Sequence, residues 1–171
     1  MKKTLAQKTL ALTVALTCAA PALADDTNAF VEFQVLKPEV AAEMADAAML
    51  ACRAMGYQVG VTVVDRFGLP QVFVRDRFAG AHVYETSRRK AWTAVSFRTG
   101  TTELAVTTQA GEISSGIRHL TEALPLGGGL VVYEGGGSMV AGIGVSGAPG
   151  PDLDDECAQA GIDAIEDQIA F

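Results

Sequence analysis

The sequence predicts an α+β domain in which helices flank a central antiparallel sheet. Two pairs of β-branched runs are each joined by a short glycine-containing turn, which is the pattern of a β-hairpin. Segments with helical spacing of apolar residues precede, separate and follow the two hairpins. Because each hairpin pairs its own strands antiparallel, this order of elements favours one antiparallel sheet with helices packed on it.

Helical spacing and turn residues place the first elements along the chain. A helix is predicted over 38–55, since a proline opens it and a glycine follows its last turn. The runs VGVTVVD (59–65) and QVFVRD (71–76) predict the first hairpin. Residues 82–98 predict a second helix, which is expected to end at Gly100.

The rest of the chain continues this pattern. Thr101 or Thr102 is expected to cap a shorter third helix, which is followed by a loop rich in glycine, serine and proline. Residues 130–147 predict the second hairpin, with its turn at 134–138. Asp152 is expected to cap the last helix, whose acidic first turn complements the helix dipole.

The stretch GIGVSG, residues 142–147, fits the dinucleotide-binding pattern G-x-G-x-x-G. Such a site needs a strand before the glycines and a helix that opens inside the motif, so that helix amides meet the pyrophosphate. Here the motif lies inside a predicted strand, and two prolines delay the next helix. The glycines therefore indicate a strand that bends or that approaches another backbone closely.

The first 24 residues have the features of a secretory signal peptide. Three lysines lie near the start, an apolar run follows, and the segment closes with an A-x-A site. We expect cleavage near Ala24, export to the periplasm or outside the cell, and a single domain over 25–171.

The exported chain is strongly acidic. The first 24 residues hold three of the 13 basic residues and none of the 20 acidic ones, which leaves a net charge near −10. Such a surface repels phosphate backbones and anionic lipids, so we expect neither a nucleic-acid nor a membrane partner.

Two cysteines, Cys52 and Cys157, lie outside the signal segment, each in a predicted helix. In an oxidising compartment an even pair indicates a disulfide, which would stabilise the fold by up to about 4–5 kcal/mol for a loop of this size. The alternative is a pair of buried free thiols.

A histidine and a basic cluster on the second predicted helix are candidates for a ligand site. His82 is either an iron ligand or a polar surface or cap residue. The basic cluster consists of Arg88, Arg89 and Lys90. The cluster could bind the propionates of haem or a small organic acid, because arginine binds a planar carboxylate through two nitrogens. The alternatives are a solvated helix face and ion pairs with an acidic neighbouring subunit.

The glycine run Gly127, Gly128 and Gly129 allows two interpretations. Successive backbone N–H groups can form a nest that binds an anion. The run equally suits the start of a strand that packs tightly against its neighbour. The chain contains no Cys-x-x-Cys-His sequence, which excludes covalent haem attachment of the c type.

Four sequence blocks resemble those of a known family. In chain order within residues 35–167, they are VTVVDRFGLPQVFVRD, AGAHVYETSRRKAWTAVSF, LPLGGGL and GGGSMVAGIGVSGAPGPDLDDECAQAGI. They resemble the haem-binding GlcG/HbpS-like family, which also supplies the C-terminal domain of PduO-type corrinoid adenosyltransferases. The resemblance implies a profilin-like fold of α/β/α layers and homo-oligomers, from dimers to octamers. It also implies non-covalent haem binding, with slow haem degradation or a sensor-kinase partner in some exported members.

The resemblance also indicates which residues hold the haem. The propionate contacts it implies are Arg88, Arg89 and Lys90. It makes Thr101 or Thr102 a weak oxygen ligand of the iron, and we add His82 because imidazole is the better ligand. The expected function is storage, transport or sensing of haem rather than catalysis. The alternative is a haem-free protein that binds a small carboxylate or assists a periplasmic dehydrogenase in glycolate or alcohol oxidation.

Overall fold

The computed structural model describes residues 29–171, and residues 33–171 form the compact unit considered below. The expected signal peptide lies outside the described residues. The elements in chain order are α1 (Pro38–Ala54), β1 (Gly60–Asp65), β2 (Pro70–Arg75), α2 (Val83–Phe97), α3 (Thr101–Thr107), the 3₁₀ helix η1 (Ser115–His119), β3 (Gly129–Tyr133), β4 (Met139–Ser146), α4 (Pro151–Asp163) and α5 (Glu166–Ile169). This is the predicted order, with η1 and α5 in addition.

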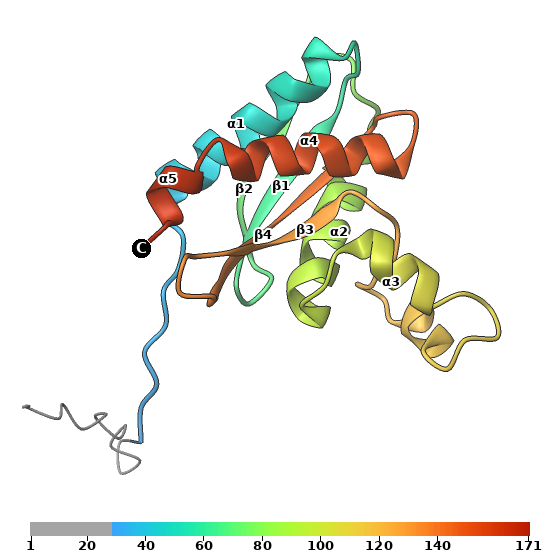
Figure 1. Ribbon diagram of the computed structural model, residues 1–171. Coiled ribbons are helices and arrows are strands. Elements are labelled where there is room, and N and C mark those ends of the chain that lie inside the picture. Colours follow the sequence, from blue (N-terminus) through green and yellow to red (C-terminus); the bar gives the residue numbers. More distant parts are fainter. Residues whose placement is uncertain (1–28) are drawn as a thin grey trace, which may run out of the picture. The chain divides into compact units, whose positions relative to one another are not determined.

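A four-stranded antiparallel sheet with strand order β2-β1-β4-β3 is the centre of the fold (Figure 1). Both predicted hairpins are present, and they join through β1 and β4, where Val61 lies opposite Val145. Helices α1 and α4 lie side by side on one face of the sheet, and α2 covers the other (Figure 1). The predicted α+β class, with helices flanking a central antiparallel sheet, is confirmed.

The main hydrophobic core lies between the sheet and the α1–α4 layer. Val61 and Val63 of β1 and Ile143 of β4 point to this side and are fully buried. A disulfide joins Cys52 of α1 to Cys157 of α4, with a Cα–Cα distance of 5.4 Å. The predicted disulfide is therefore confirmed, and it ties together the two helices of this layer.

On the other face, α2 lies unusually close to β4. A Cβ atom added to Gly144 would overlap the carbonyl oxygen of Ser87 in α2 and lie 2.7 Å from the backbone nitrogen of Ala91. A Cβ on Gly142 would lie 2.5 Å from Cγ1 of Val95. Since alternate residues of a strand share a face, these two glycines leave β4 without side chains where α2 crosses it. The GIGVSG stretch is thus a site of close backbone approach and not a nucleotide-binding turn.

Three helix ends differ from their predicted positions. Helix α2 ends before Arg98, which takes the left-handed conformation with φ of 55° and serves as the C-cap. Gly100 is the N-cap of α3, so neither threonine caps that helix by its side chain. Helix α4 begins at Pro151 after an extended Gly150, one residue before the cap predicted at Asp152. Proline suits this first helical position, because its fixed φ is already helical and its missing N–H is not needed there.

Asp76, which follows β2, anchors the end of α1. Its buried carboxylate accepts hydrogen bonds from Nε of Arg53 at 2.8 Å and from the backbone N–H of Arg77 at 2.7 Å. The Arg53 guanidinium lowers the pKa of Asp76 below its ordinary value. Hydrogen bonds to the charged form have this effect, because they disfavour protonation.

We predict that replacing both Cys52 and Cys157 by alanine lowers the free energy of unfolding by roughly 2–4 kcal/mol. The disulfide joins residues 105 positions apart, so its loss frees a long loop in the unfolded chain. Urea unfolding with and without a phosphine reductant measures the effect. The reductant should bring the wild type down to the stability of the double variant, which it should leave unchanged. Equal stability of the oxidised and reduced wild type would contradict the prediction.

We predict that Gly144→Ala lowers the free energy of unfolding by about 1–3 kcal/mol, because the added methyl forces α2 away from β4. Thermal and urea unfolding measure the loss. The matched control is Gly116→Ala in η1, where an added Cβ meets nothing within 4 Å. Similar effects of the two substitutions would show that close packing at β4 does not limit stability.

We predict that Asp76→Asn destabilises the protein at neutral pH and that the difference from wild type shrinks in acid. A carboxylate with a lowered folded pKa contributes stability above its unfolded pKa, and that contribution is lost as the pH falls through the folded value. Urea unfolding at pH 7, 5 and 3 tests this, with the exposed α1 residue Asp46→Asn as control. A difference that stays constant over this range would contradict the role of the charge.

Candidate functional site

A cleft of about 290 Å³ lies between the start of α2 and the loop that joins β4 to α4. His82, Thr86 and Lys90 line one side of it. They follow one another at intervals of four residues, so they share one face of the helix. Residues 146–150, the end of β4 and the loop after it, form the opposite wall, and Pro151 at the start of α4 continues it. In that loop, Gly147 has a φ of +128°, which residues other than glycine rarely adopt.

His82 lies at the exposed edge of the cleft. It occupies the N-cap position of α2, but its side chain makes no capping hydrogen bond. The imidazole lies over Gly80, where an added Cβ would come within 2.7 Å of both Nδ1 and Cε1 of the ring. The side chain is therefore a surface imidazole at a cleft and not a helix cap.

Two hydroxyl groups lie next to His82 inside the cleft. Oγ1 of Thr86 is 2.6 Å from Oγ of Ser146 and 3.0 Å from the backbone carbonyl oxygen of His82. These contacts connect α2 to the last residue of β4. Neither residue is in the set predicted from the sequence, although Thr86 follows His82 by one helical turn and that spacing is a usable signal.

Lys90 lies at the closed end of the cleft with a side chain only 1% exposed. Its ammonium donates to the carbonyl oxygen of Val145 at 2.9 Å and to Oδ2 of Asp154 at 2.8 Å. The other carboxylate oxygen of Asp154 accepts the backbone N–H of Ala148 at 3.0 Å. Burial raises the pKa of Asp154, and the Lys90 ammonium opposes that rise. The structure thus gives this predicted propionate contact a partner from its own chain.

Arg88 and Arg89 point away from the cleft towards the loop that precedes β3. Arg88 forms an ion pair with Glu122 at 2.7 Å. Arg89 donates to the carbonyl oxygens of Glu122 at 3.3 Å and of Ala123 at 2.9 Å, and it lies 3.6 Å from the carboxylate of Glu85. Both guanidinium groups therefore attach this loop to α2.

The glycine run holds a carboxylate of the same chain. The N–H of Gly128 donates to Oδ1 of Asp155 at 2.6 Å, and the exposed hydroxyl of Thr102 donates to Oδ2 of the same residue. The N–H of Gly129 donates to the buried hydroxyl of Thr101 at 2.8 Å. Gly127 has no room for a side chain, since a Cβ there would overlap Thr102. Only one backbone N–H of the run, that of Gly128, binds the carboxylate, and the N–H of Gly129 binds a hydroxyl instead, so the run starts a tightly packed strand and does not form a nest of successive N–H groups.

The four groups predicted to bind an external carboxylate therefore each lie against an internal one. Arg88 pairs with Glu122, Arg89 with Glu85 and Lys90 with Asp154, and the glycine run binds Asp155. The structure brings His82 and Lys90 to the same cleft, whereas the arginines and Thr102 lie outside its lining. The polar side chains of the cleft that the sequence did not indicate are Thr86, Ser146 and Asp154.

Comparison with known proteins identifies the family. A model of the family described as "Haem degrading protein HbpS-like" matches residues 36–163. The chain belongs to the HbpS-like family. The crystal structure of an HbpS double mutant from Streptomyces reticuli is 38% identical, with a TM-score of 0.75, and the match covers 87% of this chain and 99% of that one. The crystal structure of a PduOC:haem complex is 31% identical, with a TM-score of 0.72, over 77% of this chain and 95% of that one.

A curated relative, the corrinoid adenosyltransferase PduO of Salmonella typhimurium, is 32% identical over 125 residues, which make up 72% of this chain. The match spans only 37% of the length of that relative. The similarity therefore concerns about a third of PduO and not the whole of that protein.

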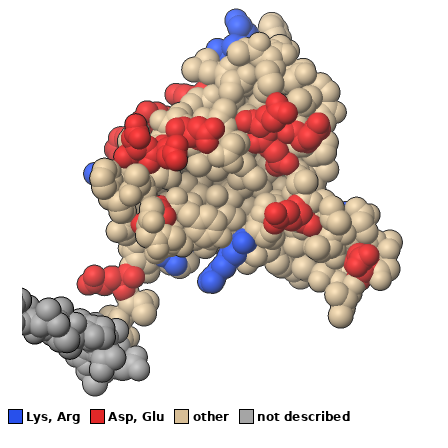
Figure 2. Space-filling model, in the orientation of Figure 1, with Lys and Arg blue, Asp and Glu red and all other residues tan. Residues whose placement is uncertain are grey.

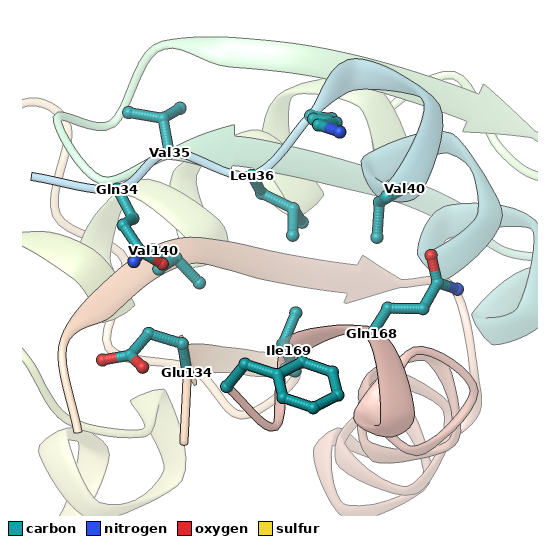
Figure 3. A pocket seen from close by; sticks show the side chains of 10 residues that line it. Gln34, Val35, Leu36, Val40, Glu134, Val140, Gln168 and Ile169 are labelled. Carbon is teal, nitrogen blue, oxygen red and sulfur yellow. The ribbon is translucent and has the colours of Figure 1, made fainter. Parts of the chain in front are cut away.

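A second, larger cavity of this HbpS-like chain lies by the C-terminus (Figure 3). It measures about 430 Å³, and apolar side chains converge in it from Leu36, Val40, Val140 and Ile169. Among the described residues, its lining includes no histidine, cysteine, methionine or tyrosine, the side chains that most often ligate haem iron in proteins. Size alone therefore does not make it the haem site.

Acidic side chains gather over α4 and α5 (Figure 2). The exposed acids of α1, α4 and α5 are Glu39, Glu43, Asp46, Asp152, Glu156, Asp163, Glu166 and Asp167. Within residues 29–171 no three His, Cys, Asp or Glu side chains are arranged to hold a metal ion, and no helix is long and apolar enough to span a bilayer.

Proposed function

We propose that this protein binds haem non-covalently at the cleft beside α2, with His82 as the iron ligand. The observation that carries the proposal is an imidazole at the edge of a cleft whose buried cation, Lys90, is already paired within the chain. Histidine is the common protein ligand of haem iron, and a bound haem would supply the iron for ligand binding or electron transfer. The family description and the relative crystallised with haem support haem as the ligand.

The residues present fit an iron ligand better than a complete haem pocket. Ligand sites usually measure about 300–1,000 Å³ and cover most of their ligand. At about 290 Å³ the cleft lies just below that range, so it would hold one edge of a porphyrin. We therefore propose that the protein acts as a homo-oligomer in which a second copy covers the rest of the haem.

A small carboxylate is the competing ligand, and the volume of the cleft would suit it. The charges do not, because Arg88, Lys90 and the glycine run each bind a carboxylate of the chain. An external acid would have to displace one of them. The same occupancy argues against propionate contacts at these groups, so it is the imidazole of His82 that favours haem over a small acid. A role beside a periplasmic dehydrogenase or a sensor kinase would concern protein partners and not this cleft.

We also propose that the protein is exported and loses its first 24 residues. The signal-like sequence supports export, and so does the disulfide, since such bonds persist mainly in oxidising compartments. N-terminal sequencing of the protein from a periplasmic extract tests this step. A start at Met1 would contradict it.

We predict that purified 25–171 protein binds haemin saturably with a sharp Soret band, and that His82→Ala shifts the band and weakens binding. Removing a partner of a bound metal costs about 10–100-fold even in the outer shell, so loss of the ligand should cost at least as much. The control is His119→Ala, a histidine that does not line the cleft. Thr102→Ala tests the alternative oxygen ligand.

Two outcomes would contradict this assignment. An unchanged spectrum in His82→Ala would remove that residue from the site, and non-saturating binding by the wild type would remove haem. In the second case, glycolate and lactate should be tested for an increase in melting temperature. A saturable increase with either acid would support the small-carboxylate function instead.

A further inference from the structure

The buried pair of Lys90 and Asp154 connects the helix that carries His82 to the opposite wall of the cleft. Lys90 belongs to α2, Asp154 to the first turn of α4, and their contact at 2.8 Å joins the two helices. Each partner also holds backbone of the wall. Lys90 binds the carbonyl of Val145, just before the loop, and Asp154 binds the N–H of Ala148, within it.

We propose that Lys90 and Asp154 are positioning residues, which fix the 146–150 wall opposite His82 and do not contact the ligand themselves. The inference rests on the proposed function, since the ligand it concerns is the one held at His82. It reassigns Lys90, which the sequence places among the contacts of a ligand carboxylate.

Occupancy is the first argument for this assignment. The side chains of Lys90 and Asp154 are only 1% and 6% exposed. The ammonium has two acceptors in the chain, and both carboxylate oxygens have a donor. Gly128 closes over the pair, since a Cβ there would lie 2.9 Å from Nζ of Lys90 and 2.7 Å from Cβ of Asp154. A ligand would gain access to this cation only by breaking the pair.

The composition of the wall is the second argument. Between Ser146 and Pro151 the chain reads Gly-Ala-Pro-Gly, so no large side chain is present to pack the loop in place. Glycine adds conformational freedom, and Gly147 already has a positive φ. Ala148 touches the hydrophobic core only through its small methyl group, and its hydrogen bond to Asp154 adds a charged anchor in the middle of the loop. Val145, just before the loop, is held by its pairing with β1 and by the bond from Lys90.

The two possible roles of Lys90 predict opposite effects of Asp154→Asn. If Lys90 binds a ligand carboxylate, neutralising Asp154 frees the ammonium and strengthens haemin binding. If the pair positions the wall, the same substitution weakens binding, because the wall loses its charged anchor. Lys90→Met weakens binding in both cases. If Lys90 contacts a ligand carboxylate, however, the loss is seen with haemin and not with a haemin whose carboxylates are blocked.

The experiment compares wild type, Asp154→Asn, Lys90→Met and the control Ser87→Ala. The control removes a buried hydrogen bond of α2, 2.7 Å from Oγ of Ser87 to Oγ1 of Thr62, that does not involve the loop. Each protein is titrated with haemin and with haemin dimethyl ester, which lacks free carboxylates. Hydrogen exchange of the 146–150 segment is followed without haem.

We expect both pair variants to exchange faster in 146–150 than the control does, and to bind haemin and its ester with the same loss, roughly tenfold. Tighter haemin binding by Asp154→Asn, or a loss in Lys90→Met confined to haemin, would overturn the proposal. Unchanged exchange in 146–150 in both variants would overturn it as well. If the wild type binds neither haemin nor its ester, the haem function fails, and the exchange data alone still decide whether the pair holds the wall. If one variant does not fold, the other answers the same question.

Discussion

The close contact between α2 and β4 is the constraint on which the arrangement of the site depends. Because Gly142 and Gly144 present no side chains, the backbone of α2 rests directly on the strand, and this fixes the rotation of the helix. That rotation turns the face of His82, Thr86 and Lys90 towards the loop after β4. It turns Arg88 and Arg89 towards the loop before β3. A packing requirement in a strand therefore decides which polar side chains of α2 share a cleft.

The acidic composition of the chain explains what happens to the cationic groups. Acidic residues outnumber basic ones, 20 to 13, so a basic side chain that is partly or fully buried usually has a carboxylate of the same chain within reach. Arg88 and Lys90 are examples. Asp154 and Asp155 are adjacent in the first turn of α4, yet one binds Lys90 and the other binds Gly128 and Thr102. Such carboxylates compete with any external acid at a high effective concentration. Recognition in the cleft then depends on the imidazole, the hydroxyls and the shape of the wall.

Local patterns in the sequence were sufficient for most of the fold, because helices and hairpins are specified by residues close in the chain. The start of α1 and both hairpins follow from a proline, turn glycines and β-branched runs. Helix ends were less predictable. Arg98 takes the left-handed C-cap conformation that glycine usually adopts. Gly100, which was expected to end α2, is instead the N-cap of α3.

The site was predictable only in part, because its walls come from segments far apart in the sequence. His82 and Lys90 could be proposed from one helix, but Ser146 lies 60 residues beyond Thr86, its hydrogen-bonding partner. No local pattern indicates that Asp154 meets Lys90, since the two residues are 64 positions apart. The disulfide joins residues 105 positions apart and could still be predicted, because only two cysteines lie outside the expected signal segment and so only one pairing is open to them within one chain. Carboxylates are numerous, and their pairing is decided by the packing of α4 against the sheet.

Haem needs both an apolar pocket for the porphyrin and a side chain that binds the iron, and each of the two cavities described above offers only one of these. The larger one has apolar side chains at its centre but no histidine, cysteine, methionine or tyrosine, and the smaller one has His82 but little volume. A porphyrin held at His82 would leave much of its apolar surface exposed to water, and this exposed surface favours association with another apolar surface. If the proposed function holds, a second copy of the protein covers this exposed porphyrin surface. Haem binding then promotes self-association, and self-association strengthens haem binding. Haem affinity would then depend on protein concentration, because whatever binds the assembled form preferentially also stabilises it.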